Sequence, residues 1–280
     1  MGAPSITAGT DGTAAGTAAV RWAAREAVRR NLLLRIVHVL QWDWAVSRYD
    51  FAGEHFRMAR EGAQTVVRDA VRQAAEAAPG LMAAEAQVRI GRPMTQLLNA
   101  SVGAAGLVVG TRAHGGLSER LLGSSARRIA AHAHCPVVVV RGRADPGAGP
   151  VATGVDDSAC DDAVLDAAFA TAAGRDASLV VVRSYAPTPA TEQVTADPEA
   201  AHRDRLAEQL APWQNKYPQV AVETLVSAES TAATLTEISH GTQLIVAGHH
   251  GHGLISGNLF NATTGHLLQH SDCPVLVVSA

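Results

Sequence analysis

The feature that most constrains the fold of this 280-residue chain is an internal repeat. Residues 6–39 and 151–184 share a short apolar strand, the pattern Gly-x-Asp, an alanine-rich helical stretch and a second apolar strand. Residues 106–140 and 243–278 match in the same way, and both contain Cys-Pro-Val before a final apolar run. Because the copies follow one another in the same order, we predict two similar domains in tandem, joined by the Gly- and Pro-rich segment 142–150.

Strand and helix patterns alternate within each copy. In the first copy we expect strands near 5–10, 33–39, 84–90, 106–110 and 136–141, and helices near 14–30, 54–78, 94–104 and 123–133. Several strands, such as PVVVV, are continuous apolar runs, which are typical of a parallel sheet covered by helices on both faces. We therefore predict the α/β class, with two tandem doubly wound, Rossmann-like parallel-sheet domains over residues 1–143 and 149–280.

Composition excludes several classes of protein. Lys and Arg number 23 against 26 Asp and Glu, so no basic excess attracts nucleic acid. No uncharged apolar stretch approaches the roughly 18 residues of a membrane span, and the first residues lack the features of a signal peptide. We therefore expect a cytoplasmic protein with no membrane span. The three cysteines, Cys135, Cys160 and Cys273, are too scattered for a disulfide framework, so we expect them to pack as small apolar residues.

A glycine-rich loop follows the strand at 106–110 and leads to a helix that begins with Gly-Ser-Ser. Ligands of doubly wound sheets bind beyond the carboxyl ends of the strands, which is where this loop begins. Glycines let backbone N–H groups converge on an anion, and the start of a helix supplies further N–H donors. Ser124 and Ser125 can cap the helix or contact phosphate, and Arg112 or Arg120 can neutralise charge. An ordinary strand-to-helix turn with a serine cap is the alternative.

Neither of the common nucleotide-binding motifs is present, because the chain has no Walker loop and no Gly-x-Gly-x-x-Gly after its first strand. The spacing from Gly110 over Ala113 to Gly123-Ser124 resembles instead the Gly-x2-Gly-x9-Gly-Ser/Thr motif of ATP-binding universal stress proteins. The resemblance includes GTDGT and GVDDS at the first strand of each copy and HCPVVVVR and DCPVLVV at the ends. It is closest to the tandem, two-domain actinobacterial type, whose domains have the adenine nucleotide alpha hydrolase-like fold.

The resemblance implies a stress-response regulator that binds ATP, together with Mg²⁺, in the first copy. Asp11 would bind the ribose hydroxyls, Gly9 would keep the strand end slim beside the nucleotide, and Val39 would meet the adenine edge through its backbone. The phosphates would be surrounded by Gly110, Thr111, Arg112, Ala113, His114, Gly115, Gly116, Arg120, Gly123, Ser124 and Ser125. Ala113 departs from the motif glycine and would cost about 1 kcal/mol if that position needs a positive φ.

The second copy keeps only part of the implied site, namely Gly154, Asp156, Gly248, Gly251, His252 and Gly253. Asn261-Ala262 stands where the motif has Gly-Ser, although Thr263 and Thr264 follow. Asp157 replaces Gly12 and would add negative charge beside an anion. The sequence therefore predicts a weaker or altered site in the second copy.

Other functions are left open by the sequence. A degenerate interaction module without nucleotide is one alternative, and a weak ATPase without an identifiable catalytic base is another. His249, His250 and His252 lie in one short segment and could bind a metal, but a phosphate-side or solvent-facing role is simpler, so we predict no metal site.

Several residues near the helix and strand ends have simpler explanations. Contact with the helix dipole or with solvent accounts for the four histidines at the ends of the last helices, to which we assign no chemistry; they are His132, His134, His266 and His270. Trp42 and Trp44 either cover the nucleotide or pack beneath a helix. The strands PVVVV and PVLVV are expected at sheet edges, where they would pair the two copies as an intramolecular pseudo-dimer and leave further homo-oligomerisation open.

Overall fold

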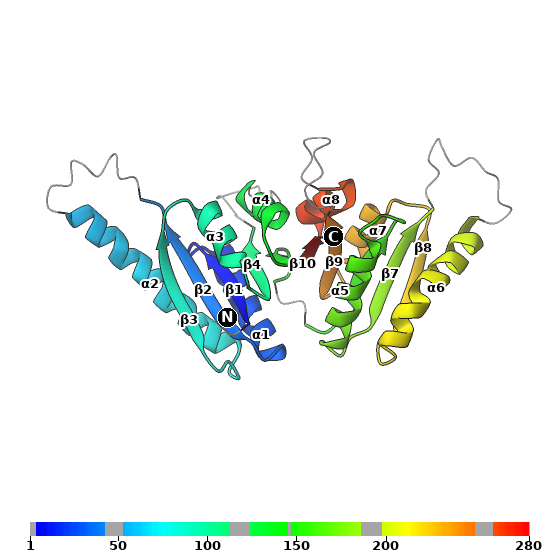
Figure 1. The fold of residues 1–280 in the computed structure, drawn as a ribbon, viewed down its shortest axis with the longest axis horizontal. Coiled ribbons are helices and arrows are strands. Elements are labelled where there is room, and N and C mark those ends of the chain that lie inside the picture. Colours follow the sequence, from blue (N-terminus) through cyan, green and yellow to red (C-terminus); the bar gives the residue numbers. More distant parts are fainter. Residues whose placement is uncertain are drawn as a thin grey trace. The chain divides into compact units, whose positions relative to one another are not determined.

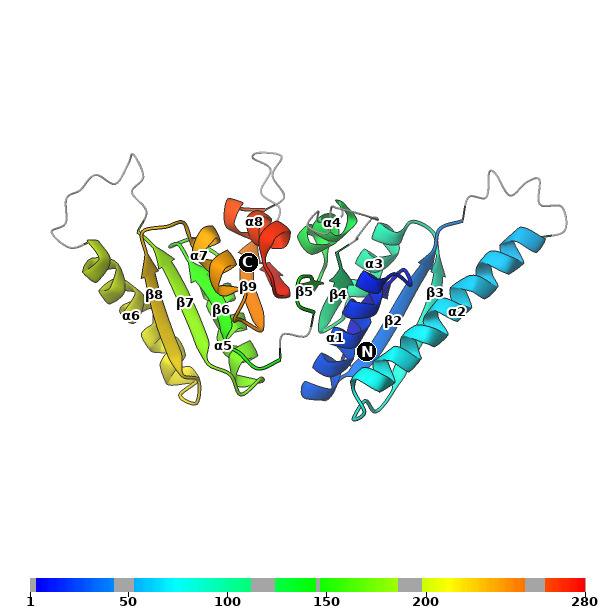
Figure 2. The same cartoon turned by 180° about the vertical axis from the view of Figure 1, so that it is seen from behind.

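The computed structural model describes residues 4–42, 53–111, 124–144, 147–185, 198–249 and 260–279, with the side chains of Ser124 and Pro198 left out. Contacts divide the chain into two compact units, residues 1–140 and 141–280. Each unit contains one copy of the sequence repeat, and both have the same succession of strands and helices (Figures 1 and 2).

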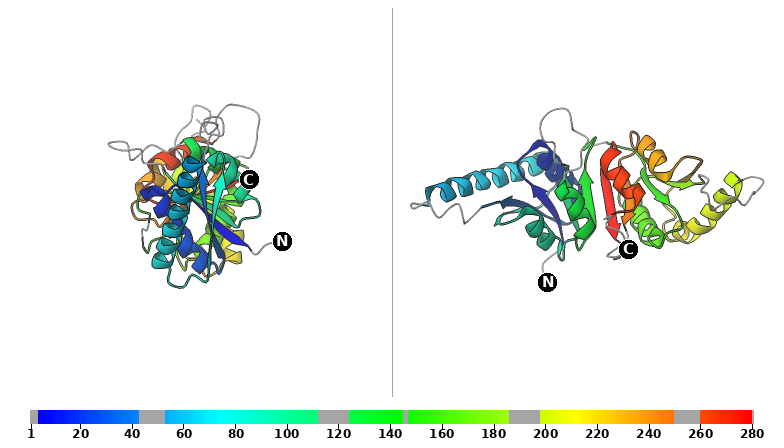
Figure 3. Two further views of the ribbon diagram at one scale, coloured as in Figure 1. Left: turned by 90° about the vertical axis from the view of Figure 1, so that its left-hand side faces the viewer. Right: turned by 90° about the horizontal axis from the view of Figure 1, so that it is seen from above.

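The first unit is a parallel α/β sheet. Its strands are β1 (Ser5–Thr10), β2 (Leu33–Leu40), β3 (Ala84–Ile90), β4 (Gly106–Gly110) and β5 (Val137–Val140), in the order β3-β2-β1-β4-β5. Its helices are α1 (Ala14–Arg29), α2 (Glu54–Ala77), α3 (Pro93–Ser101) and α4 (Ser124–His132). Figure 3 shows α1 and α2 on one face of this sheet and α3 and α4 on the other. Every strand and helix predicted for the first copy is confirmed.

The second unit repeats this arrangement. Its strands are β6 (Val151–Val155), β7 (Leu179–Ser184), β8 (Val222–Ser227), β9 (Leu244–His249) and β10 (Val275–Ser279), all parallel in the order β10-β9-β6-β7-β8. Its helices are α5 (Asp161–Ala173), α6 (Pro198–Lys216), α7 (Thr231–Ile238) and α8 (Ala262–His270). The predicted doubly wound fold is therefore present twice, and β5 and β10 are each the outermost strand of their own unit's sheet.

The core of the first unit explains why its strands are apolar runs and its first helix is rich in alanine. All six residues of β1 and all four of β5 are buried, as helices on both faces require. Ala19, Ala23 and Ala27 of α1 have no exposed surface. Four-residue spacing puts these three small side chains on one helix face, so α1 can lie close to the sheet.

The cysteines pack as the sequence predicts, although to different degrees. Cys160 and Cys273 are buried and Cys135 is partly buried, and all three are free thiols. Burial raises the pKa of Cys135 and of Cys273 to about 11, so these two thiols stay protonated at neutral pH.

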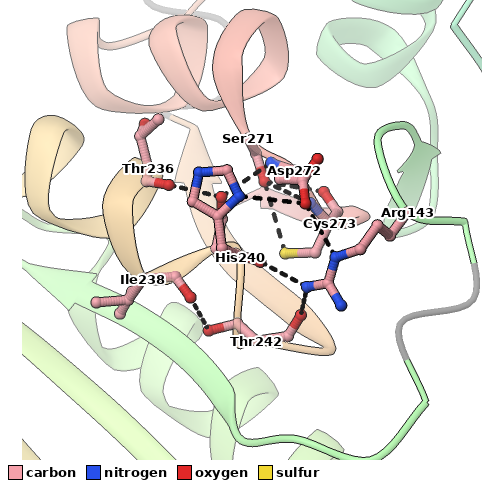
Figure 4. Close-up of polar contacts among 9 residues, drawn as sticks. Arg143, Thr236, Ile238, His240, Thr242, Ser271, Asp272 and Cys273 are labelled. Carbon is pink, nitrogen blue, oxygen red and sulfur yellow. Dashed lines mark hydrogen bonds and ion pairs between the residues drawn. The ribbon is translucent and has the colours of Figure 1, made fainter.

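Residues 141–143, which include the start of the predicted linker, belong by their contacts to the second unit. Figure 4 shows the polar contacts of Arg143. Arg143 Nε donates to Asp272 Oδ2 over 2.9 Å, and Arg143 Nη2 donates to the carbonyl oxygen of Ser239 over 3.1 Å. Gly142 has a φ of +54°, and a Cβ there would lie 2.4 Å from the Asp272 backbone. This close approach requires glycine at position 142.

Candidate functional site

A cavity of about 190 Å³ lies at the carboxyl ends of the strands in the first unit. It sits where the strand order changes direction, because β2 and β4 lie on opposite sides of β1. The lining residues are Gly9, Thr10, Asp11, Thr13, Ala15, Gly16, Val37, Val39, Gln41, Pro93, Leu97, Val109, Gly110, Ser125, Ala126 and Ile129.

The turn from β1 to α1 places an acidic group at this cavity. The exposed Asp11 accepts through Oδ1 from the backbone N–H of Thr13 over 3.1 Å and from the Thr13 hydroxyl. Thr13 in turn caps α1 by accepting from the N–H of Gly16 over 3.3 Å. A Cβ on Gly16 would lie 2.7 Å from Thr10 Oγ1, and Gly12 has a φ of +80°. Two glycines and a threonine cap therefore hold the Asp11 carboxylate in place.

Two further glycines line the cavity, and a side chain at either position would meet a different obstacle. A Cβ on Gly9 would approach Leu97 Cδ2 to 3.0 Å, so any larger residue would project into the cavity. A Cβ on Gly110 would lie only 2.2 Å from the Ala15 carbonyl oxygen, so this position is fixed by the close passage of α1 over β4. Gly110 is thus required by packing, whether or not it also contacts a phosphate.

Val39 lies on the apolar side of the cavity. The β1–β2 ladder ends at the pair Thr10 and His38, so Val39 is one residue beyond the last pair. Val37, Leu97 and Ile129 also line the cavity and give it an apolar surface. The cavity thus combines an apolar lining with a carboxylate, and mostly apolar surfaces with a few placed polar groups are typical of small-molecule sites.

The predicted phosphate side of the site is only partly described. Ser125 lines the cavity at the start of α4, which begins at Ser124, and the Thr111 N–H donates to the Val140 carbonyl oxygen over 3.2 Å. The remaining predicted contacts lie outside the described residues. They are Arg112, Ala113, His114, Gly115, Gly116, Arg120 and Gly123.

The equivalent place in the second unit holds a cavity of only about 20 Å³. That is room for about one water molecule, while the cavity of the first unit is several times larger than a water needs. Gly154, Asp156 and Gly248 line this small space, and Gly251, His252 and Gly253 lie outside the described residues. The two units therefore share a fold but differ in the space they leave for a ligand.

Larger side chains fill the cleft of the second unit. Because Asp11 aligns with Asp156 in the repeat, Cys160 stands at the place of Ala15 and Asp161 at the place of Gly16. Thr264 likewise replaces Ala126, and its Oγ1 donates to the Gly248 carbonyl oxygen over 2.6 Å. The glycine-loop motif does not predict these substitutions, because they lie outside it. Aligning the two copies residue by residue beside the strands would have revealed them.

Asp161 occupies the β6–α5 turn of the second unit. Its buried carboxylate accepts from the N–H of Asp157 over 2.9 Å, from the Ser158 hydroxyl over 3.1 Å and from Gln209 Nε2 over 3.1 Å. Burial raises the pKa of Asp161, because desolvation outweighs these hydrogen bonds. The Asp161 carboxylate thus accepts from two donors of this turn and from one of α6.

The negative charge that Asp157 adds to the second unit is paired with two arginines. Its carboxylate pairs with the guanidinium of Arg183, a side chain of which 3% is exposed, and with Arg205 Nη2 at 3.3 Å. Arg183 Nε also reaches His202 Nδ1, over 3.2 Å. Asp157 has a φ of +61°, which matches the left-handed conformation of Gly12 in the first unit. Two arginines therefore neutralise the charge that the sequence places there.

Asn261 is a helix cap in the second unit. Its side chain accepts from the Thr264 N–H over 2.8 Å at the start of α8. Asn261-Ala262 lacks the glycine and the serine hydroxyl of the motif. The Asn261 side chain nevertheless caps α8, and Asn is among the preferred N-cap residues.

The predictions for the aromatic and histidine segments are tested only in part. Trp42 packs edge-on against Phe56 near the start of α2, with ring centroids 5.2 Å apart, and Trp44 lies outside the described residues. His249 is buried against Phe260, while His250 and His252 lie outside the described residues. Within the described ranges, no three His, Cys, Asp or Glu side chains come together as a metal site would require.

Of the helices in the part of the chain that the structure describes, none combines the length and the apolar character needed to cross a membrane.

Comparison with known proteins identifies the family. The family model described as the universal stress protein family matches residues 4–141 and 149–279. A universal stress protein of Mycolicibacterium smegmatis is 33% identical over 98% of this chain and 96% of its own length, and universal stress protein Rv2005c of Mycobacterium tuberculosis is 31% identical over 97% and 96%. The crystal structure of a universal stress protein from Archaeoglobus fulgidus covers 98% of both chains with a TM-score of 0.75 at 16% identity, which supports the fold. The chain therefore belongs to the universal stress protein family, with one family domain matched in each half.

Proposed function

We propose that the chain is a nucleotide-dependent stress-response regulator that binds ATP in the first unit and not, or much more weakly, in the second. The observation that carries this proposal is the difference between cavities of about 190 Å³ and about 20 Å³ at equivalent places in two domains of one fold. A ligand pocket must offer an enclosed apolar surface with a few oriented polar groups, and only the larger cavity offers the room.

The described residues of the first unit fit an adenine nucleotide. Val37, Val39 and Leu97 provide an apolar slot for the base, and the oriented Asp11 carboxylate can accept from ribose hydroxyls. Ser125 at the start of α4 would face the phosphates, where N–H groups of a helix N-terminus favour anions. Mg²⁺ would be held chiefly by the phosphate oxygens, as is usual for this ion.

For the second unit, the described residues favour the alternative function, a degenerate interaction module without nucleotide. Cys160, Asp161 and Thr264 fill the cleft, and Asp161 uses the donors of the β6–α5 turn. Its role would be structural or in contacts with a partner protein. The cytoplasm is where we expect the whole chain to act.

Mass spectrometry of the denatured purified protein tests the proposal. We expect adenine nucleotide to co-purify at no more than about one molecule per chain. A chain that repeatedly carries none, and that shows no binding on titration, is an interaction module throughout. Native protein from the same preparation tests for ATPase activity: turnover that persists after Gly123→Val with Ser124→Ala would belong to a contaminant or to another site.

A further inference from the structure

The two units of the chain carry opposite net charge. Residues 1–140 contain 16 arginines, no lysine and 10 acidic residues, which gives a net charge of +6. Residues 141–280 contain 6 arginines, one lysine and 16 acidic residues, which gives a net charge of −9. The overall net charge of −3 hides this division. A charge difference of this size between two domains indicates surfaces that attract an oppositely charged partner.

Ion pairs within each unit leave the surplus charge on the surface. Several exposed arginines of the first unit have a side chain without a polar contact among the described residues; they are Arg21, Arg30, Arg60, Arg92 and Arg128. Several exposed acidic residues of the second unit have a carboxylate without an ion pair in the same described ranges; they are Asp162, Asp176, Asp204, Glu208, Glu223 and Glu237. Both surpluses are therefore available to another molecule.

Three arginines form a row along the outer side of α1. Arg21, Arg25 and Arg29 follow one another at four-residue spacing, which puts them on one side of the helix about 6 Å apart. Arg21 and Arg29 are exposed and Arg25 is half-buried, whereas Trp22 on the inner side is buried. Glu26 is the acidic residue of α1, and it pairs with Arg29. The row therefore keeps a surplus of positive charge.

The equivalent helix of the second unit, α5, has carboxylates on its outer side. Arg21 aligns with Asp166 in the repeat, and Asp162 lies one turn before Asp166. Asp162 is exposed and the side chain of Asp166 is 49% exposed, while the sequence of α5 contains no basic residue. Lys216 pairs with Asp166 over 2.6 Å, so Asp162 supplies the unpaired charge of this row. Equivalent helices of one fold thus carry opposite charges.

We propose that α1 of one chain docks on α5 of a second copy of the chain, with the arginine row of α1 beside Asp162 and Asp166. Both rows repeat every four residues, so their charges can lie opposite one another when the two helices run side by side. Each chain carries both rows, so a second copy supplies the complement of each. Contacts between two α1 helices, or between two α5 helices, would bring like charges together. Val28, 40% exposed beside the arginine row, adds apolar surface to the contact.

Sedimentation velocity of the full chain at two salt concentrations tests the proposal. The range of electrostatic attraction falls from about 30 Å at about 0.01 M salt to about 8 Å at about 0.15 M. We therefore expect self-association at the lower concentration and an association constant smaller by a factor of about ten or more at the higher one. Pairing through apolar strand edges, as predicted for β5 and β10, would not weaken in this way.

Two charge-reversed variants provide the sharper test. We expect Arg21→Glu with Arg25→Glu, and separately Asp162→Arg with Asp166→Arg, to weaken self-association by about tenfold or more, because like charges then face each other. Mixed in equal amounts, the two variants should associate again, since the reversed α1 of one matches the reversed α5 of the other. A variant that failed to fold could not produce this recovery.

Arg92→Glu with Arg128→Glu is the matched control. It changes the net charge by the same amount as the α1 variant, but it lies at the start of α3 and in α4, on the other face of the sheet. It should leave self-association nearly unchanged.

The proposal is overturned if the unaltered chain stays monomeric at low salt, if the control weakens association as much as the α1 variant, or if the mixture of folded reversed variants stays monomeric. A monomeric chain that binds polyglutamate through Arg21 and Arg25 would assign the arginine row to an unrelated acidic partner and would also overturn it.

Discussion

At the scale of single residues, the two cavities differ because of a few positions beside the strand ends. Ala15 and Gly16 of the first unit are small enough to leave room, whereas Cys160 and Asp161 fill the same places in the second. The glycine loop at 110–125 identified the family from the sequence. The residues that decide the volume of the cavity belong to no sequence motif. Whether an alanine or a cysteine near the start of a helix leaves room for a ligand depends on the side chains that face it in the folded domain.

Gly110 provides a direct test of packing at this scale. Gly110→Ala would bring a Cβ to 2.2 Å from the Ala15 carbonyl oxygen, so α1 or β4 must shift. We expect a loss of about 1–3 kcal/mol in the free energy of unfolding, measured by urea denaturation.

Gly62→Ala is the matched control for this substitution. Gly62 lies inside α2, where an added Cβ meets no atom within 4 Å, so the change should stabilise by up to about 1 kcal/mol. Equal effects of the two substitutions would contradict the packing assigned to Gly110.

At the scale of elements, the turn from β6 to α5 contains an internal polar cluster. The Asp161 carboxylate accepts three hydrogen bonds there, and Asp157 pairs with Arg183 and Arg205. The sequence predicted each strand and helix of the first unit correctly because their apolar periodicity is local. It did not predict the pairing of Asp157 with Arg183, because these residues meet only after β6 and β7 lie side by side.

The pKa of Asp161 gives this cluster a signature in the dependence of stability on pH. Burial raises the pKa in the folded chain above the ordinary value of 3.8, so the folded state holds this proton more tightly than the unfolded state. Stability from this group is therefore present at low pH and is lost as pH rises from 3.8 through the folded pKa.

Comparison with Asp161→Asn isolates the effect. The free energy of unfolding of the unaltered chain, relative to that of Asp161→Asn, should fall as pH rises through this window in urea titrations. A difference that stays constant with pH would show that the fold leaves this pKa unchanged, and one that grows would show that the fold lowers it; either result contradicts the prediction.

At the scale of the whole molecule, residues 141–143 hold the linker to the second unit. Arg143 donates to Asp272 and to the carbonyl oxygens of Ser239 and Thr242. The glycines and prolines of 142–150 predict a linker. The sequence does not indicate which groups accept hydrogen bonds from Arg143. Its contacts depend on turns that lie about 100 and 130 residues further along the chain.

Arg143→Ala tests this attachment. We expect a loss of about 1 kcal/mol in the free energy of unfolding of the second unit, because one exposed ion pair and two backbone acceptors lose their donor. Arg57→Ala removes only an exposed ion pair with Glu61 within α2 and should have little effect. Equal effects of the two changes would show that the contacts of Arg143 do not stabilise the unit.

The pairing of the two copies remains a prediction from the sequence. If β5 and β10 pair the copies as an intramolecular pseudo-dimer, then residues 1–143 alone should form a homodimer through the same strand. Sedimentation of this fragment should show a concentration-dependent dimer. A fragment that stays monomeric at high concentration would remove the support for such pairing.

The measurement that tests the central claim most directly is calorimetric titration of the nucleotide-free full chain with ATP and Mg²⁺. We predict one tight site per chain, because the described residues of the first unit leave a cavity of about 190 Å³ and those at the equivalent place in the second leave about 20 Å³. Gly123→Val with Ser124→Ala should remove it, and Asp156→Ala in the second unit should leave it nearly unchanged. Losing two hydrogen bonds to phosphate, at about 1.5–3 kcal/mol each, corresponds to a weakening of roughly a hundredfold or more. Two equal sites per chain, or loss of the tight site on Asp156→Ala, would contradict the account.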